Sequence, residues 1–214
     1  MSLIEPYASS SRVRLSAILK HIIDQGKLAA VPTETFYGLA TNPFDRHAIE
    51  RLLSVKGRGE HKAILVLIAD YAQLSLLVSQ VSPPAQVLMD AFWPGPLTLL
   101  FTARPALPEA LTAHTGTIGV RWSPCAPLIK LLSDVGPVTG TSANRSGCPP
   151  ARSAAEVQAA LGSDLALIVD AGTTPGGLPS TVVDARSAVR LVREGPVSRQ
   201  MLQNVLETHG FTLL

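Results

Sequence analysis

The sequence predicts an α/β protein in which helices cover an open, twisted, mixed sheet. Segments whose apolar residues recur at helical spacing alternate along the chain with short apolar runs of strand length. Near the end, two strand-like runs follow each other closely, as in a hairpin, which indicates a mixed sheet. The 214 residues are 46% hydrophobic and 16% charged, which is enough apolar content for a single domain with a mainly aliphatic core.

The helices are predicted from apolar spacing and from the residues at their ends. Leu15 to Ile23 repeat at helical spacing until Gly26 stops the pattern. Asp45 is a suitable N-cap for a second helix, which ends near Lys56. Further helices are expected over residues 71–78, 84–92 and 126–135, after Ser153, and within 198–214.

Short apolar runs predict strands over residues 28–31, 64–68, 97–102, 117–122, 138–141, 165–169, 181–183 and 189–192. Pro32 ends the first run, so residues 33–38 are expected in a loop at the carboxyl end of a strand. Ligands of open α/β sheets bind beyond such ends, which makes Thr33, Glu34 and Thr35 candidates for a site. Capping of a turn or helix by the hydroxyls is the alternative.

Charge and cysteine content exclude several classes of protein. A formal charge of +2 is too small to predict bulk nucleic-acid binding, so any basic patch must be local. Cys125 and Cys148 form no C-x-x-C motif and no zinc-like spacing with histidine, which favours free thiols in a reducing cytosol. The first residues lack a signal-peptide pattern, and no apolar run reaches membrane-spanning length. We therefore expect a cytoplasmic protein without a membrane segment.

Two cations, Lys56 and Arg58, stand close together at the end of a predicted helix. A guanidinium can bind two phosphate oxygens, and an ammonium can lie between phosphates, so this pair suits a polyanion such as a nucleoside triphosphate. Lys62 is a third candidate cation. A solvated helix end, where cations meet the helix dipole, is the alternative.

Polar residues in two distant segments complete the candidate pocket. Ser142 and Asn144 follow a predicted strand, in a loop suited to phosphate or ribose oxygens, although an ordinary turn has the same composition. Arg121 lies inside the apolar run 118–122, where an unpaired cation would be costly. Both a structural salt bridge and an anionic ligand would satisfy it.

Motifs of several other enzyme classes are missing from the sequence. There is no G-x-x-x-x-G-K-[ST] phosphate loop, no G-x-G-x-x-G fingerprint and no G-x-S-x-G nucleophile elbow. The five histidines show no metal-ligand spacing, and only His61, beside the cations, is kept as a candidate.

Seven blocks, in order along the chain, resemble YrdC-like proteins of the short bacterial L-threonylcarbamoyladenylate synthase type. They are PTETFYGL from Pro32, KGR from Lys56, WPGPLT from Trp93, GVR from Gly119, TSANRSG from Thr141, PSTVVD from Pro179 and REG from Arg193. The resemblance implies a YrdC-like domain over residues 13–197, with an N-terminal extension over 1–12 and a C-terminal helix and tail over 198–214.

The resemblance also implies an activity. YrdC-like proteins have an open α/β twist with a large, positively charged concave cavity. The implied enzyme is a nucleotidyltransferase that makes L-threonylcarbamoyl-AMP from L-threonine, bicarbonate and ATP and releases pyrophosphate. Partner proteins then transfer the threonylcarbamoyl group to an adenosine next to the tRNA anticodon. Mg²⁺ is expected to be carried by the ATP phosphates rather than by a dedicated protein site.

The family motifs imply roles for individual residues in this chain. Catalysis is assigned to Lys56 and Arg58. ATP binding is assigned to Lys56, Arg58, Lys62, Thr117, Ser142, Asn144 and Arg193. L-Threonine binding is assigned to Thr33, Arg121, Thr141 and Ser180.

The segment after Arg58 departs from the family pattern. Prolines common there are replaced by Gly59-Glu60-His61-Lys62-Ala63, which lacks their conformational restriction, and the hypothesis is that this segment closes over ATP. Two other functions stay open. One is a related carbamoyl-adenylate-forming domain, as in hydrogenase-maturation proteins. The other is a double-stranded RNA-binding or ribosome-assembly module, which the low net charge and the lack of an aromatic run weaken.

Overall fold

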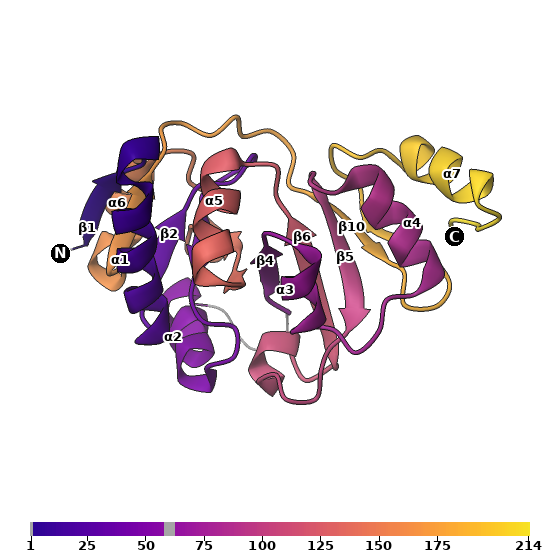
Figure 1. The fold of residues 1–214 in the computed structure, drawn as a ribbon, viewed down its shortest axis with the longest axis horizontal. Helices are drawn as coiled ribbons and strands as arrows, with labels where there is room; N and C mark the ends of the chain where they lie inside the picture. The colour runs from indigo at the N-terminus through magenta and orange to yellow at the C-terminus, as the bar shows by residue number, and fades with distance from the viewer. Residues whose placement is uncertain (1, 58–62) are drawn as a thin grey trace.

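The computed structural model describes residues 2–57 and 63–214 (Figure 1). Its α-helices are α1 (Arg12–Asp24), α2 (Arg46–Lys56), α3 (Tyr71–Ser75), α4 (Pro83–Phe92), α5 (Ala126–Val135), α6 (Ala154–Leu161) and α7 (Arg199–Thr208). Its strands are β1 (Leu3–Pro6), β2 (Ala29–Val31), β3 (Gly38–Ala40), β4 (Leu65–Ile68), β5 (Leu97–Thr102), β6 (Thr117–Trp122), β7 (Val138–Thr139), β8 (Thr141–Ser142), β9 (Leu167–Asp170), β10 (Thr181–Asp184) and β11 (Arg190–Arg193). Short 3-10 turns occupy Ser9–Ser11, Glu109–Thr112 and Gly162–Asp164.

The strands form two mixed sheets rather than the single sheet that the sequence predicts. The first sheet has the order β1-β9-β2-β3-β8, and the second has the order β11-β10-β5-β6-β4-β7. Each sheet combines parallel pairs, such as β2 with β9 and β4 with β6, with antiparallel pairs, such as β2 with β3 and β5 with β6. The α/β class and the mixed strand directions are therefore confirmed.

The chain passes from one sheet to the other between β7 and β8, at Gly140. A Cβ atom on Gly140 would lie 2.4 Å from the side chain of Leu67 on β4, so only glycine lets the two sheets approach this closely here. The crossing residue also lines the cavity described below. The join between the sheets and the candidate site are therefore the same place.

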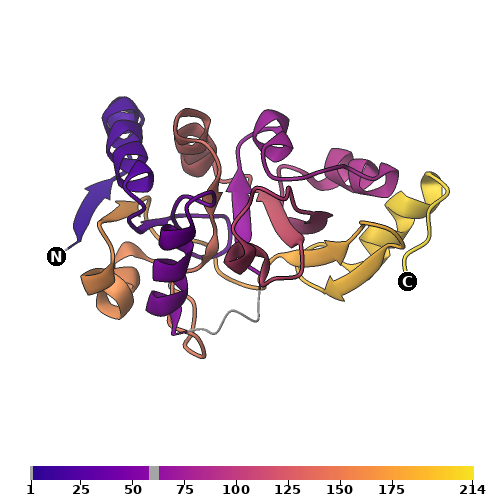
Figure 2. The same ribbon diagram turned by 90° about the horizontal axis from the view of Figure 1, so that it is seen from below.

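Helices cover both faces of the sheets. Figure 2 shows α1, α5, α3 and α4 along one side, with α2 and α6 on the other. α1 packs on α5, and α4 packs on α7. The core is mostly aliphatic, as predicted, and its larger members that are fully buried include Leu39, Leu52, Leu67 and Leu88.

Helix α2 is fixed at both ends by local chemistry. The Asp45 carboxylate accepts hydrogen bonds from the backbone amides of His47 (2.8 Å) and Ala48 (3.3 Å), which caps the helix start as predicted. Gly57 adopts a left-handed conformation, with φ of 59°, and ends the helix. Lys56 therefore occupies the last turn, where α2 approaches the join between the sheets.

Two terminal segments also belong to the folded structure. Within the predicted N-terminal extension, β1 pairs in parallel with β9 at the edge of the first sheet. Within the predicted C-terminal segment, α7 is capped by Ser198, whose hydroxyl accepts a hydrogen bond from the Met201 amide. No helix in the described residues is long and apolar enough to span a membrane.

Candidate functional site

A cavity of about 370 Å³ opens where the two sheets meet. Residues from both sheets and from the loop between β2 and β3 line it. Its polar lining consists of Thr33, Thr35, Tyr37, Thr98, Arg121, Thr141, Ser142, Ser180 and Arg193. The described lining thus contains many hydroxyls, two arginines and no carboxylate, which suits an anionic ligand with several hydrogen-bonding oxygens. The strong positive charge predicted for this cavity stays a prediction.

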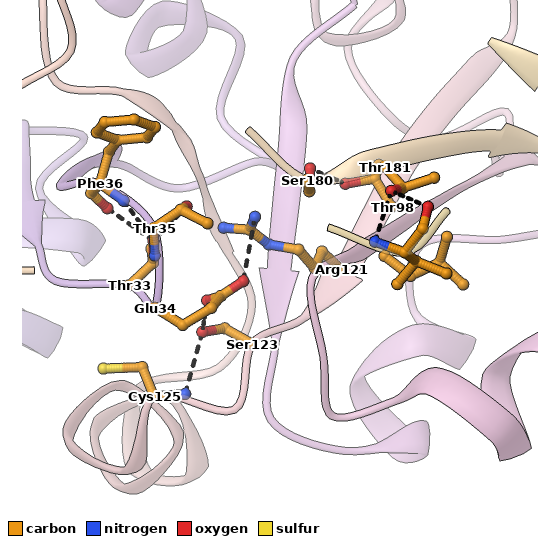
Figure 3. A network of polar contacts seen from close by, with 12 residues as sticks. Thr33, Glu34, Thr35, Phe36, Thr98, Arg121, Ser123, Cys125, Ser180 and Thr181 are labelled. Carbon is orange, nitrogen blue, oxygen red and sulfur yellow. Dashed lines mark hydrogen bonds and ion pairs between the residues drawn. The ribbon is translucent and has the colours of Figure 1, made fainter. Parts of the chain in front are cut away.

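Arg121 is the most deeply buried cation of this cavity. It lies on β6, and its side chain is 5% exposed. Burial lowers the pKa of Arg121, and the Glu34 carboxylate opposes that effect. Its Nη1 atom lies 3.3 Å from Glu34 Oε1, and its Nε atom has no hydrogen-bond partner among the described residues (Figure 3). The guanidinium therefore retains donor capacity for a ligand.

The loop after β2 is held by the hydroxyl of Thr33. This hydroxyl accepts hydrogen bonds from the amides of Thr35 (3.1 Å) and Phe36 (3.3 Å), and it donates to the Phe36 carbonyl (2.7 Å). Thr33 and Thr35 are both buried and both line the cavity. Tyr37, the next polar residue, donates its hydroxyl to the Gly172 carbonyl (2.7 Å). The turn thus presents two threonine side chains to the cavity.

Ser180 and Arg193 form a second polar group on the wall made by β10 and β11. Ser180 exchanges a 2.8 Å hydrogen bond with the Thr98 hydroxyl of β5. Arg193 donates to the Ser180 carbonyl through Nη2 (2.7 Å) and Nε (3.1 Å). Burial lowers the pKa of Arg193, and its charge also opposes that of Arg121, so the two cations lie close enough to interact. An anion bound between them would relieve this repulsion.

Lys56, Ser142 and Asn144 form a third polar group. The Lys56 ammonium is buried and donates to the Ser142 carbonyl (2.6 Å) and to Asn144 Oδ1 (3.0 Å). Ser142 also donates its hydroxyl to Asn144 Oδ1 (2.6 Å). Ser142 lines the cavity, whereas Lys56 and Asn144 contact Ser142 from outside the described lining. Lys56 therefore supports the loop after β8 with hydrogen bonds as well as with charge.

The structure gathers most of the predicted site residues around one cavity. Thr33, Arg121, Thr141, Ser142, Ser180 and Arg193 line it, and Lys56 and Asn144 support its wall. Thr117 lies at the opposite end of β6 from Arg121, and its hydroxyl accepts a 2.6 Å hydrogen bond from Arg186. Thr117 is outside the described lining, and its role stays a prediction.

Part of the predicted site falls outside the described residues. Arg58 and Lys62 lie there, as does His61. The hypothesis that residues 59–63 close over ATP also falls mainly on this segment. Ala63, the first described residue after it, lines the cavity.

Two residues of the network, Thr98 and Ser123, were not predicted as site residues. Two others, Glu34 and Thr35, were predicted as site candidates without an assigned ligand. Thr35 and Thr98 line the cavity. Glu34 forms an ion pair with Arg121, and Ser123 donates a hydrogen bond to Glu34. Thr98 carried a usable signal, because it is a hydroxyl residue inside an apolar strand. Within the described residues, no group of three or more His, Cys, Asp or Glu side chains is arranged to hold a metal ion.

Comparison with known proteins places the chain in a family. The model of the Sua5, YciO and YrdC proteins, described as telomere recombination, matches residues 21–195. The chain belongs to the Sua5/YciO/YrdC family. The family predicted from the sequence motifs is therefore confirmed.

Relatives of similar and greater length share this family. A Mycobacterium tuberculosis protein is 38% identical over 192 residues, covering 89% of this chain and 88% of its own length. The threonylcarbamoyl-AMP synthase of Nitrosococcus oceani is 36% identical over 183 residues, covering 84% and 96%. The crystal structure of Pyrococcus abyssi Sua5 complexed with L-threonine superposes with a TM-score of 0.90 at 30% identity, covering all of this chain and 62% of that one.

Proposed function

We propose that this chain is a threonylcarbamoyl-AMP synthase, which forms L-threonylcarbamoyl-AMP and pyrophosphate from L-threonine, bicarbonate and ATP. The observation that carries the proposal is the buried Arg121 guanidinium, which faces a hydroxyl-rich cavity and whose Nε donor has no partner among the described residues. An amino-acid carboxylate is the ligand that this arrangement fits best. The proposed function is also supported by similarity to Sua5 with bound L-threonine and to a relative named as the synthase.

The threonine end of the site is proposed to lie around Arg121. Its guanidinium would bind the substrate carboxylate, while the hydroxyls of Thr33, Thr141 and Ser180 would bind the amine and the side-chain hydroxyl. Arg121 and Thr141 lie on different sheets, Thr33 and Ser180 lie in loops beside strands, and all four line the same cavity. Binding would therefore orient the threonine amine for reaction with carbon dioxide derived from bicarbonate.

The nucleotide end is proposed to lie toward Ser142 and Arg193. Ser142 and Arg193 line the cavity, and Lys56 hydrogen-bonds both to Ser142 at the end of β8 and to Asn144 in the loop that follows. Arg58 and Lys62 are proposed to add direct phosphate contacts, and Thr117 stays a further candidate. Mg²⁺ carried by the ATP phosphates would reduce their negative charge.

The proposed reaction requires no protein nucleophile. The threonine amine combines with carbon dioxide to give a carbamate and loses a proton. A carbamate oxygen then attacks the α-phosphorus of ATP, and the bond to the pyrophosphate group breaks. The residues of the site would contribute by aligning the reactants and by neutralising the charge that moves to pyrophosphate.

The product is proposed to supply proteins that transfer the threonylcarbamoyl group to tRNA, which implies a cytoplasmic location. The RNA-binding alternative is less favoured, because a relative of similar length is named as a synthase. The site described here also fits small substrates better than a helical RNA.

The test is pyrophosphate release in the presence of ATP, bicarbonate and L-threonine, with each omitted in turn. We expect release to depend on all three. Arg121→Met should raise the KM for threonine about tenfold or more, whereas Arg14→Met, which removes an exposed ion pair with Glu5, should leave it unchanged. Threonine-independent release, or an unchanged KM in folded Arg121→Met, would contradict the proposal.

A further inference from the structure

Burial of the charged Arg121 guanidinium is unfavourable in free energy unless a partner is fixed beside it. The Arg121 side chain is 5% exposed, it lies within a strand of the second sheet, and its Nε atom donates no hydrogen bond to a described residue. A long side chain with one contact can adopt other rotamers, and an arginine that binds a planar carboxylate has to present its fork in one orientation. Something must therefore hold the guanidinium toward the cavity before substrate arrives.

Glu34, in the loop after β2 of the first sheet, supplies that contact as an ion pair. Its Oε1 atom lies 3.3 Å from Arg121 Nη1, and its Oε2 atom accepts a hydrogen bond from the hydroxyl of Ser123. Ser123 in turn accepts a 3.2 Å hydrogen bond from the Cys125 amide, which fixes the position of its oxygen. Figure 3 shows the Glu34 carboxylate between Arg121 and Ser123, which follows β6 directly. The contact thus joins the loop after β2 to β6.

Glu34 lies behind the cavity rather than in its wall. Its neighbours Thr33 and Thr35 line the cavity, whereas Glu34 is outside the described lining. The hydroxyl of Thr33 holds the backbone of this turn through the amides of Thr35 and Phe36. The turn therefore places the two threonines in the cavity wall and the Glu34 carboxylate against Arg121 outside that wall.

We propose that Glu34, oriented by Ser123, is a positioning residue that holds the Arg121 guanidinium in place for the carboxylate of the amino-acid substrate. This inference rests on the proposed function, because it takes threonine as the ligand of Arg121. Glu34 takes no part in bond formation. Its role is to fix the direction of the guanidinium and to tie the two sheets together behind the site.

The alternative role of Glu34 makes the opposite prediction. A carboxylate beside Arg121 also repels an incoming carboxylate and cancels part of the attraction of the guanidinium. If Glu34 acted only through its charge, removing it would strengthen threonine binding. If Glu34 positions Arg121, removing it weakens binding, so the sign of the change separates the two roles.

The experiment measures the dissociation constant of L-threonine by calorimetry and, for weak binders, by ligand-observed NMR. The variants are Glu34→Ala, Glu34→Gln and Ser123→Ala, with Glu5→Ala as the matched control. Glu5 is also paired with an arginine, and its side chain is 15% exposed against 16% for Glu34. Glu34→Ala is measured again in an Arg121→Met background, which forms a double-mutant cycle.

Positioning predicts that Glu34→Ala weakens threonine binding about tenfold or more, and Glu34→Gln and Ser123→Ala about threefold or more, since each removes part of the anchor. Glu5→Ala should leave the constant unchanged. In the Arg121→Met background, loss of Glu34 should have no further effect, because the residue acts only through Arg121.

Three results would overturn the inference. They are unchanged or tighter binding in Glu34→Ala, an equal loss in both backgrounds, and, should the alanine variant fail to fold, unchanged binding in Glu34→Gln. Failure of the unaltered protein to bind threonine would overturn the proposed function as well. The two failures are therefore distinguishable.

Discussion

Replacement of Lys56 by methionine tests how the loop after β8 is held. The ammonium donates to the Ser142 carbonyl (2.6 Å) and to Asn144 Oδ1 (3.0 Å), and Lys56 is only 4% exposed. Hydrogen bonds to charged groups contribute about 1.5–3 kcal/mol each. Both acceptors keep another partner, because Asn144 N binds the Ser142 carbonyl and the Ser142 hydroxyl binds Asn144 Oδ1. Burial of the thioether offsets a further part of the loss, so we expect a net destabilisation of about 2–3 kcal/mol.

The assay is urea unfolding, in which this loss lowers the midpoint by about 1 M. Lys20→Met is the control, because Lys20 is exposed and forms only a surface pair with Asp24, so its loss should change stability by less than about 0.5 kcal/mol. ATP binding should weaken together with stability in Lys56→Met, since Ser142 forms part of the cavity wall. Stability equal to that of the unaltered protein would refute the view that Lys56 supports this loop.

Three further predictions concern other parts of the molecule. Gly195→Ala should lower the free energy of unfolding in urea by about 1–3 kcal/mol and reduce turnover. The reason is that the added Cβ would lie 2.3 Å from the backbone carbonyl oxygen of Pro179, just before β10. An unchanged free energy of unfolding and unchanged turnover would contradict this close contact. Cys148, which is exposed, should react with iodoacetamide at neutral pH faster than Cys125. The thiolate is the reactive form, and burial raises the pKa of the Cys125 thiol. Peptide mass spectrometry should show this order of modification, and the reverse order would count against it. The hydrogen bond from Arg186 lowers the pKa of Asp184 below its ordinary value of 3.8, so its stabilisation is present above that pH and is lost as the pH falls through the folded-state pKa. Because solvent screens the pair, Asp184→Asn should cost less than about 1 kcal/mol at pH 7 and lose its effect in strong acid, and a cost that grew toward low pH would contradict the assignment.

Elements with strong local signals could be predicted closely from the sequence. β5, β6 and α5 have the expected boundaries, because prolines, polar residues and a glycine mark their ends. β9 and β10 are displaced from the expected bounds by one or two residues. β1 and β3 were not expected, since they are short and their existence depends on pairing with distant strands. The division into two sheets depends on the same long-range pairing.

The candidate site shows the same distinction. The motifs supplied the residues that line the cavity, including Arg121 and Ser142, because hydroxyls and cations in apolar surroundings are visible in the sequence. They did not indicate that Lys56 would be buried against Asn144, or that Glu34 would be the partner of Arg121. Such pairs form only when separate elements pack together, and no local pattern encodes them.

The proposed synthase activity is tested by mass spectrometry of the reaction product formed from ATP, L-threonine and ¹³C-labelled bicarbonate. We predict threonylcarbamoyl-AMP whose carbamoyl carbon carries the label, formed only when threonine is present and strongly reduced in Arg121→Met at low threonine. A folded, ATP-binding protein that forms no labelled adenylate, or forms it without threonine, would not be a threonylcarbamoyl-AMP synthase.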